Sequence, residues 1–210
     1  MKLKTPQFTV SLTPRLLSQV VMEEKVYGIS FENETWEEKL SQIEFNECIF
    51  NQVDFSNANF DQVSLIDVVF KKCDLSNVNF SHTTIHRVVF EDCKLVGTNF
   101  SVSSIKDIAM KNVLANYINF SAAKLDYMKL NECVLEQSIW NEAKLEHIEL
   151  ISCNLKEAEF LNTSLKGIDL SNSNINGIHV TPFYLQGLIV SESQAIALSK
   201  LFGLIVKESD

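Results

Sequence analysis

The fold is decided by residues 45–60, FNECIFNQVDFSNANF, in which every fifth residue is phenylalanine. The same frame of large apolar residues continues without insertion to Val180, through Leu65, Leu95 and Phe120, which makes 28 units of five residues. This period matches neither the 3.6-residue turn of a helix nor the two-residue alternation of a strand. A short fixed repeat over two thirds of a chain predicts a stacked, quasi-one-dimensional solenoid.

A second position in each unit is also apolar or small. It lies two residues before the large one, as at Cys48, Val53 and Ala58, and the two positions together give 56 sites without a charge. All 29 charged residues between Glu44 and Asp169 fall on the other three positions. This partition predicts a narrow tube with two inward and three outward residues per unit.

The composition of the 210-residue chain limits the class of protein. It is 46% hydrophobic and 21% charged, as a globular protein is, and three prolines and six glycines are too few for a collagen or a linker. The net charge of −9 argues against direct binding of nucleic acid, because phosphate neutralisation needs Lys and Arg. The first six residues, MKLKTP, lack the apolar core of a signal peptide, and no apolar run is long enough to span a membrane. We therefore expect a cytoplasmic protein.

Cysteine and histidine do not form a metal or catalytic motif. The cysteines are expected to point inward as small, reduced hydrophobes, and none forms a CxxC pair or has a histidine at zinc-ligand spacing; they are Cys48, Cys73, Cys93, Cys133 and Cys153. The histidines are expected to be scattered on the surface without supporting carboxylates; they are His82, His86, His147 and His179. We expect neither enzymatic activity, nor a metal, nor a cofactor.

One region departs from the repeat. Met110 and Ala115 occupy positions where the other units carry a larger or more rigid residue. The second inward position becomes larger nearby, which predicts volume compensation; these residues are Ile108, Val113, Ile118 and Met128. A local bulge near Leu114 is the alternative.

Residues 1–39 lie outside the frame and are expected to cap the open end of the solenoid. Thr13 and Pro14 resemble a helix start, which predicts a short helix from Arg15 to Glu24. Ile29, Phe31 and Trp36 predict an irregular first coil, displaced by one residue from the main frame. A contact with a partner is the alternative role of this segment.

Residues 181–210 are expected to form a strand–helix–strand module. The tetrapeptide GLIV occurs at 187–190 and again at 203–206, and Ser191 to Gln194 forms a capping-box start for a helix ended by Gly203. Two short apolar strands at a rod end would leave exposed edges, which predicts an end-to-end homodimer. The expected interface comprises Leu185, Leu188, Val190, Ile196, Leu198, Leu201, Phe202, Leu204 and Val206.

Residues 58–60 (ANF), 74–77 (DLSN) and 79–81 (NFS) resemble the pentapeptide-repeat family, whose motif is roughly A(D/N)LXX. The resemblance covers about residues 40–180. It implies an all-β fold, a right-handed quadrilateral β-helix with four units per coil, hence about seven coils and a length of about 34 Å at about 4.8 Å per coil.

A 20-residue coil fixes which side chains stack. Cys73 should lie on Cys93 and Cys133 on Cys153, reduced in a cytosolic setting. A column of stacked amides is expected on one face, where it would stabilise the coils; it comprises Asn59, Asn79, Asn99 and Asn119.

The complete layout, with its acidic rod and C-terminal module, is similar to that of the Qnr-type quinolone-resistance proteins. The resemblance implies a dimeric, DNA-mimicking rod that binds DNA gyrase or topoisomerase IV, inhibits the enzyme and protects it from quinolones. Qnr-type proteins often carry projecting loops that contribute to protection, and this frame has none between residues 45 and 180. Protection is then expected to rest on the N-terminal segment or to be weaker than inhibition.

Mimicry requires an uneven charge distribution. Between Glu44 and Asp169 the net charge is −7, about one charge per 5 Å of rod, which is about threefold less dense than duplex DNA. With four units per coil, two neighbouring faces carry the acidic excess and are the expected partner-binding surface. Their acidic residues are Asp54, Asp61, Asp74, Glu136, Glu142, Glu157 and Glu159, against Lys94 and Lys156. The alternative function is a non-catalytic scaffold or immunity-type protein with a partner other than a topoisomerase.

Overall fold

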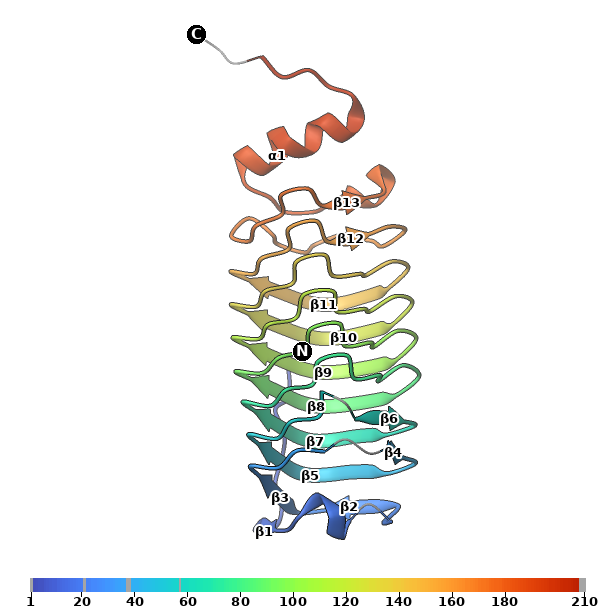
Figure 1. The fold of residues 1–210 in the computed structure, drawn as a ribbon. Helices are drawn as coiled ribbons and strands as arrows, with labels where there is room; N and C mark the ends of the chain where they lie inside the picture. The colour runs from blue at the N-terminus through green and yellow to red at the C-terminus, as the bar shows by residue number, and fades with distance from the viewer. Residues whose placement is uncertain (1, 21, 37–38, 57, 208–210) are drawn as a thin grey trace.

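The computed structural model describes residues 2–20, 22–36, 39–56 and 58–207, excluding the side chains of residues 39, 41, 59 and 61. The chain forms a parallel β-solenoid of about eight turns with one short C-terminal helix, and Figure 1 shows the turns stacked as a rod. This confirms the predicted β-helix and adds the irregular N-terminal coil to the seven of the repeat.

The long strands are β5 (Glu44–Asn51), β7 (Ser64–Lys71), β8 (Thr84–Glu91), β9 (Ser104–Lys111), β10 (Lys124–Asn131) and β11 (Lys144–Ile151). The shorter strands are β1 (Thr13–Pro14), β2 (Lys25–Tyr27), β3 (Ile29–Glu32), β4 (Lys39–Ser41), β6 (Asn59–Asp61), β12 (Glu159–Phe160) and β13 (His179–Val180). The helical segments are the 3-10 turns η1 (Leu17–Gln19), η2 (Pro182–Leu185) and η3 (Lys200–Phe202), and the α-helix α1 (Glu192–Ser199).

The strands pair in parallel at an offset of 20 residues, as four units per coil require. Phe50 pairs with Phe70, Phe70 with Phe90 and Phe90 with Met110. The largest sheet follows the order β1, β3, β5, β7, β8, β9, β10, β11, with β2 also pairing with β5. This register fixes which outward side chains lie above one another.

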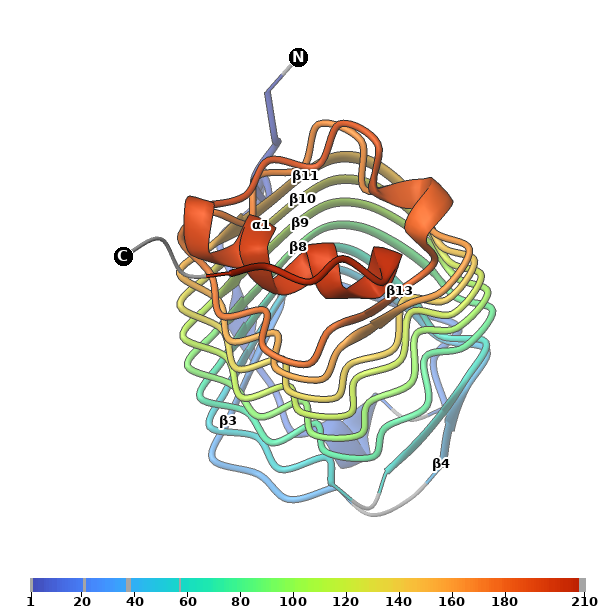
Figure 2. The ribbon, with the colours of Figure 1, turned by 90° about the horizontal axis from the view of Figure 1, so that it is seen from above.

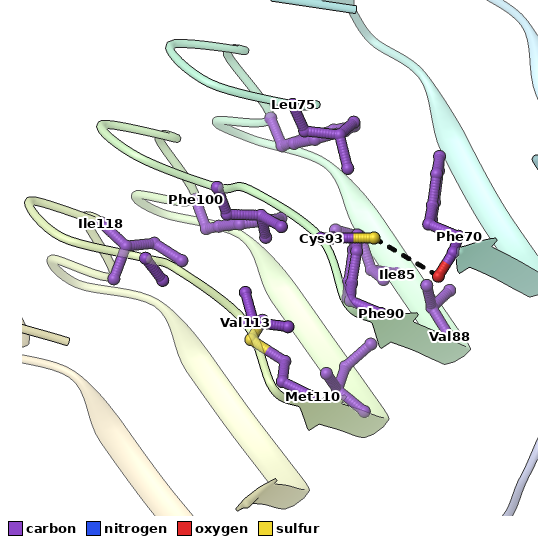
Figure 3. Packing of buried hydrophobic residues seen from close by; sticks show 14 of the residues in the cluster. Phe70, Leu75, Ile85, Val88, Phe90, Cys93, Phe100, Met110, Val113 and Ile118 are labelled. Carbon is purple, nitrogen blue, oxygen red and sulfur yellow. Dashed lines mark hydrogen bonds between the residues drawn. The ribbon is translucent and has the colours of Figure 1, made fainter. Parts of the chain in front are cut away.

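The tube is filled by stacked side chains. The rings of Phe50 and Phe70 lie 4.9 Å apart at an interplanar angle of 11°, and those of Phe70 and Phe90 lie 5.0 Å apart at 5°. Small inward polar groups bond to the main chain of the coil before, as the Cys93 thiol does to the carbonyl of Phe70 (Figure 3). The described interior is therefore mainly apolar, and small inward hydroxyls such as those of Thr98 and Ser103 also donate to main-chain carbonyls of the coil before.

The cysteines lie where the repeat predicts. All five are buried and free, and the main-chain N–H of Cys73 lies 3.4 Å from the Cys93 sulfur, which confirms that stack. Burial raises the pKa of the Cys48 thiol to about 11, so this thiol is neutral at pH 7. These groups act as core residues.

The middle of the rod is continuous. Met110 and Ala115 are buried, and Leu114 pairs in register with Lys94 and Val134. The predicted alternative of a bulge at Leu114 is therefore wrong. The space around Met110 and Met128 has no room for a water molecule, which is consistent with volume compensation.

Each corner of the coil uses a left-handed residue, which the sequence analysis missed. From Gln42 to Asn162, every described residue two places after a frame residue has a positive φ. Most of these are not glycine and include Val102, at φ 61°, and Tyr117. This conformation costs a non-glycine residue about 1–2 kcal/mol. The stacking of the coils must therefore offset a repeated local strain.

The predicted N-terminal helix from Arg15 to Glu24 is wrong. Thr13 and Pro14 form β1, and the N–H groups of Thr13 and Arg15 donate to the carbonyls of Gly28 and Ser30. This pairing with the first coil overrides the local helix-start signal, and only the single turn η1 remains. The predicted displacement of the first coil is confirmed, because Phe31 pairs with Phe50, an offset of 19 rather than 20 residues.

The first residues form an extended arm along the rod. Figure 1 shows the chain rising from β1 to an N-terminus beside the middle coils. The arm, residues 2–12, makes main-chain hydrogen bonds to carboxylates of three different coils. It spans coils that are far apart in the sequence.

At the other end, the 20-residue pairing continues past Val180 to Ile189, which pairs with Asp169. Ser191 caps α1 in the predicted capping box with Gln194, and Gly203 has the expected left-handed conformation. The two predicted strands at 187–190 and 203–206 are wrong. The first is a turn with one bridge at Ile189, and the second is irregular because no described strand lies beside it. Figure 2 shows α1 lying across the open end of the rod.

Candidate partner-binding surfaces

The N-terminal half of the predicted acidic surface is a column of residues at the same position of successive coils, one place before a frame residue. The main chain of Asp54 forms a parallel β-bridge with that of Asp74, and Asp74 forms one with Lys94. The Lys94 amine lies 3.2 Å from the Asp74 carboxylate. Burial opposes ionisation of Asp74, but hydrogen bonds from Ser76 and Lys94 outweigh it and hold the pKa of this carboxyl below its usual value. Asp74 is therefore anionic at pH 7, and Lys94 partly neutralises it.

The C-terminal half carries a second group. Glu136 accepts a hydrogen bond of 2.7 Å from the Asn154 side chain, and Glu157 accepts one of 2.8 Å from Gln137 on the coil before. Lys156 lies 3.6 Å from Glu157. These contacts hold both carboxylates against the rod.

The neighbouring face adds Glu142, exposed at a corner, and Glu159, which accepts a bond of 3.0 Å from Asn141. Asp61 belongs to β6, but its side chain lies outside the described residues. The structure thus places the described residues in two acidic groups near the two ends of the rod. The coils that carry Lys94 and Leu114 separate them, so they are not one continuous stripe.

The faces that carry the long strands β5 and β7 to β11, which we call the strand-bearing faces, have ion pairs between successive coils. Lys71 pairs with Glu91 at 3.2 Å and Lys129 with Glu149 at 2.9 Å. This contrast supports the prediction that the charge excess lies on the other two faces.

Two histidines have carboxylate partners, contrary to the sequence expectation. His86 lies 3.4 Å from Asp107, and His147 lies 3.0 Å from Asp126. No local sequence signal marks these pairs, because each carboxylate is one coil away from its histidine. Asp126, Glu146 and His147 offer three ligand atoms within 4.8 Å of one another. Asp126 is already paired with the Lys106 amine at 3.0 Å, so the group reads as an ion-pair cluster.

The predicted dimer interface forms an apolar end surface. A hollow of about 460 Å³ between the last coil and α1 is lined by residues that include six of the nine predicted: Leu185, Leu188, Val190, Leu198, Phe202 and Leu204. Leu201 lies on the other side of α1, facing a smaller hollow of about 250 Å³. Ile196 and Val206 are exposed and line neither hollow.

Two exposed apolar residues at this end were missed. Phe183 is 80% exposed and Ile205 is 90% exposed. Ile205 stands within the repeated GLIV tetrapeptide, which was the signal available for it. Within α1, all of which is described, no side chain is fully buried. This end of the rod therefore presents its apolar residues to solvent.

Comparison with known proteins gives the family. A model of the pentapeptide repeat region matches residues 43–92 and 83–160, together more than half of the chain. The chain belongs to the pentapeptide-repeat family. No curated protein matches the chain.

Solved structures of other pentapeptide-repeat proteins are similar to it at low identity. Full-length QnrB1, described as a plasmid-mediated fluoroquinolone resistance protein, is 24% identical over 86% of this chain and 90% of its own, with a TM-score of 0.41. A trypsin-treated QnrB1 variant is 22% identical over 94% and 97%, with a TM-score of 0.42. HetL, from the cyanobacterium Nostoc sp. strain PCC 7120, is 15% identical over 80% and 90%, with a TM-score of 0.37. These values are too low to extend any of these proteins' functions to this chain.

In the part of the chain that the structure describes, no helix has both the length and the apolar character needed to cross a membrane.

Proposed function

We propose that this protein is an acidic, dimeric rod in the cytoplasm that mimics duplex DNA. It binds DNA gyrase, topoisomerase IV or both on the surface that normally holds DNA, inhibits the enzyme and reduces its sensitivity to quinolones. The observation that carries the proposal is the uneven charge of the rod. The acidic excess lies on two neighbouring faces, while the strand-bearing faces carry ion pairs between coils.

The dimensions support this proposal. About eight turns at about 4.8 Å each give a rod of about 38 Å. Two such rods end to end span about 77 Å, the length of about 23 base pairs at about 3.4 Å each. A dimer thus presents a surface of the right length for the DNA-binding face of a two-fold symmetric enzyme.

The end surface supports the dimer. Phe183, Phe202, Leu204 and Ile205 are each more than half exposed at the same end of the rod. Contiguous exposed apolar residues mark interaction sites in soluble proteins. Isologous pairing through this end covers these residues and places the two acidic rods in line.

The proposal is tested by supercoiling with purified bacterial gyrase while the protein is titrated, with and without ciprofloxacin. We expect recovery of drug-blocked supercoiling at low protein concentration and inhibition of supercoiling at higher concentration. No effect in either arm of the experiment would contradict it.

Charge reversal locates the surface. Asp54, Asp74, Glu136, Glu142 and Glu159 changed together to lysine should abolish inhibition and leave the fold intact. The single change Glu142→Lys should disturb the fold least, because this side chain is exposed. Glu91→Lys on a strand-bearing face is the matched control and should leave inhibition within about twofold, because rim charges away from a contact have little effect. If the variant with all five substitutions inhibited as well as the wild type, the assigned surface would be contradicted.

The second candidate is a non-catalytic scaffold or immunity-type protein that binds a partner other than a topoisomerase. The separation of the acidic residues into two groups favours it, because a scaffold needs no continuous charged stripe. It predicts a folded dimer with no effect on gyrase or topoisomerase IV.

A further inference from the structure

The N-terminal arm lies on a row of buried carboxylates at one corner of the solenoid. The main-chain N–H groups of Lys4 and Gln7 donate to Asp107 and Asp67 at 2.8 and 2.9 Å. The N–H and the hydroxyl of Thr9 both donate to Glu47. We call Glu47, Asp67 and Asp107 the corner carboxylates; they are only 6, 5 and 2% exposed. All three are corner residues with positive φ, one on each of three coils.

The spacing of these contacts matches an extended peptide. From Gln7 to Lys4, three residues of the arm cover two coil steps, about 9.6 Å at about 4.8 Å per coil. This is the rise of an extended chain, about 3.2–3.4 Å per residue. The corner is therefore shaped for an extended main chain, and in the arm the Thr9 hydroxyl adds one side-chain contact.

The side chains of the arm hold it only in part. Lys4, Gln7 and Thr9 are exposed, and the apolar Phe8 and Val10 remain 38 and 44% exposed. No described side chain of the arm is fully buried, so the apolar burial that opposes its departure is partial. The three carboxylates add hydrogen bonds to this partial burial.

Carboxyl groups outnumber cationic side chains at this corner. Arg87 forms a two-pronged pair with Asp67, so one guanidinium faces three carboxyl groups. Burial and Arg87 lower the pKa of His86, which keeps this histidine neutral near pH 7. The buried Oδ2 of Asp107 makes no hydrogen bond of good geometry among the described atoms, and its contact with His86 Nε2 is long, at 3.4 Å. A buried anion of this kind favours a cationic partner.

The arm has that chemistry. Residues 2–12, KLKTPQFTVSL, contain two lysines and no acid, in a chain whose net charge is −9. Beside the first described residues of the arm, the corner continues along Tyr127 and His147 into a groove of about 650 Å³. An incoming peptide has room there to make its first contact.

We propose that the arm is a built-in, releasable ligand of the corner carboxylates, and that an extended cationic segment of a partner protein binds there in its place. The corner carboxylates lie in the long strands β5, β7 and β9. Glu142 and Glu159 of the acidic surface belong to a different face of the coil. The two surfaces are separate, and this site does not depend on the topoisomerase proposal.

Amide hydrogen exchange on the full chain tests the site, with an octalysine peptide as the probe and a serine–glycine octapeptide as the control. Octalysine should bind and speed exchange of the Lys4, Gln7 and Thr9 amides by about tenfold or more, with no change in β8. The serine–glycine peptide should not. Binding of octalysine without faster exchange in the arm would place it on the acidic faces and overturn the proposal, as would no binding.

A matched pair of variants separates charge from conformation. Asp107→Asn keeps a carbonyl oxygen for the Lys4 N–H and removes a charge. Asp92→Asn does the same at a corner residue that also has a positive φ but is exposed and lies away from the arm. We expect Asp107→Asn to weaken octalysine binding about tenfold and Asp92→Asn to leave it within about twofold, as for contacting and distant charges. Equal weakening by both variants would contradict the site.

Discussion

The two ends of the solenoid are closed in opposite ways. At the N-terminal end, Leu17, Val20 and Phe31 are fully buried by the irregular first coil. At the C-terminal end, α1 crosses the opening without burying a whole side chain, and Phe183 and Ile205 are at least 80% exposed. The difference teaches that one end is complete within a single chain, while the other is suited to completion by a second chain.

The ends also differ in the chemistry of their anchors. The arm at the N-terminal side is held by the carboxyl side chains of Glu47, Asp67 and Asp107. At the C-terminal end, the neutral amide of Gln194 donates to the carbonyls of Leu170 and Ser173 at 2.9 and 2.7 Å. One anchor depends on pH and the other does not.

The largest expected effect compares one phenylalanine at each end. Phe31 stacks on Phe50 at 4.9 Å, so Phe31→Ala leaves a cavity and should lower the free energy of unfolding by about 3–5 kcal/mol. Phe183→Ala should change it by no more than about 0.5 kcal/mol in the monomer, because this side chain is 80% exposed. Urea unfolding at low protein concentration measures both. Equal losses would remove the distinction between the ends.

The next effect is on association. Phe202→Asp places a charge in the apolar end surface and should weaken self-association about a hundredfold, an effect of about 2.7 kcal/mol. Val10→Asp changes a comparably exposed apolar residue at the other end and should leave association unchanged. Sedimentation velocity across a concentration series distinguishes the two. A wild-type chain that remains monomeric at micromolar concentration would contradict the dimer.

A smaller effect is expected at the neutral anchor. Gln194→Ala removes the donor to two carbonyls of the last coil and should cost about 1–3 kcal/mol. The loss should appear as faster amide exchange in α1, with exchange in β5 and β7 unchanged. Uniformly faster exchange along the whole rod would show instead that the last coil unfolds together with the rest.

The smallest expected effect is acid release of the arm. Burial opposes ionisation of Glu47 and Asp67, but hydrogen bonds from Thr9 to the first and from Arg87 and Gln7 to the second lower both pKa values. A lowered pKa adds stability that is complete above the ordinary carboxyl value, about 4, and is lost as the pH falls through the folded value. Asp107 and the neighbouring His86 face the same arm segment.

The arm amides should therefore lose their protection from exchange below about pH 4, while the amides of α1 keep theirs. NMR exchange at pH 7 and pH 3 measures both. An arm that stays protected at pH 3 would show that its carboxylates are not its main anchor.

The interior of the rod was predictable from the sequence, and the surface contacts between coils were not. The five-residue frame predicted the register that pairs Phe50 with Phe70. The frame could do so because every large residue must point into the same apolar tube, which leaves no freedom to shift one coil against the next. The arm could not be predicted, because Lys4 and Asp107 are 103 residues apart and residues 2–12 follow no period. The helix start at Thr13 was misread because its pairing partner, β3, is a tertiary contact.

For the candidate surface, a 20-residue coil assigned each acidic residue to a face, and the register of the structure agrees with that assignment, while the role of these residues in binding stays a prediction. It did not show that Lys94 and Lys156 approach Asp74 and Glu157. The period tells which side chains point outward, but not which rotamer a long outward side chain adopts.

The central claim is that the acidic rod occupies the DNA-binding surface of a topoisomerase. The most direct measurement is fluorescence anisotropy of a labelled duplex bound to gyrase while this protein is titrated. We predict that the wild-type dimer displaces the duplex and that the variant with five charge reversals does not. A folded, dimeric wild-type protein that leaves the duplex bound at every concentration would contradict the claim.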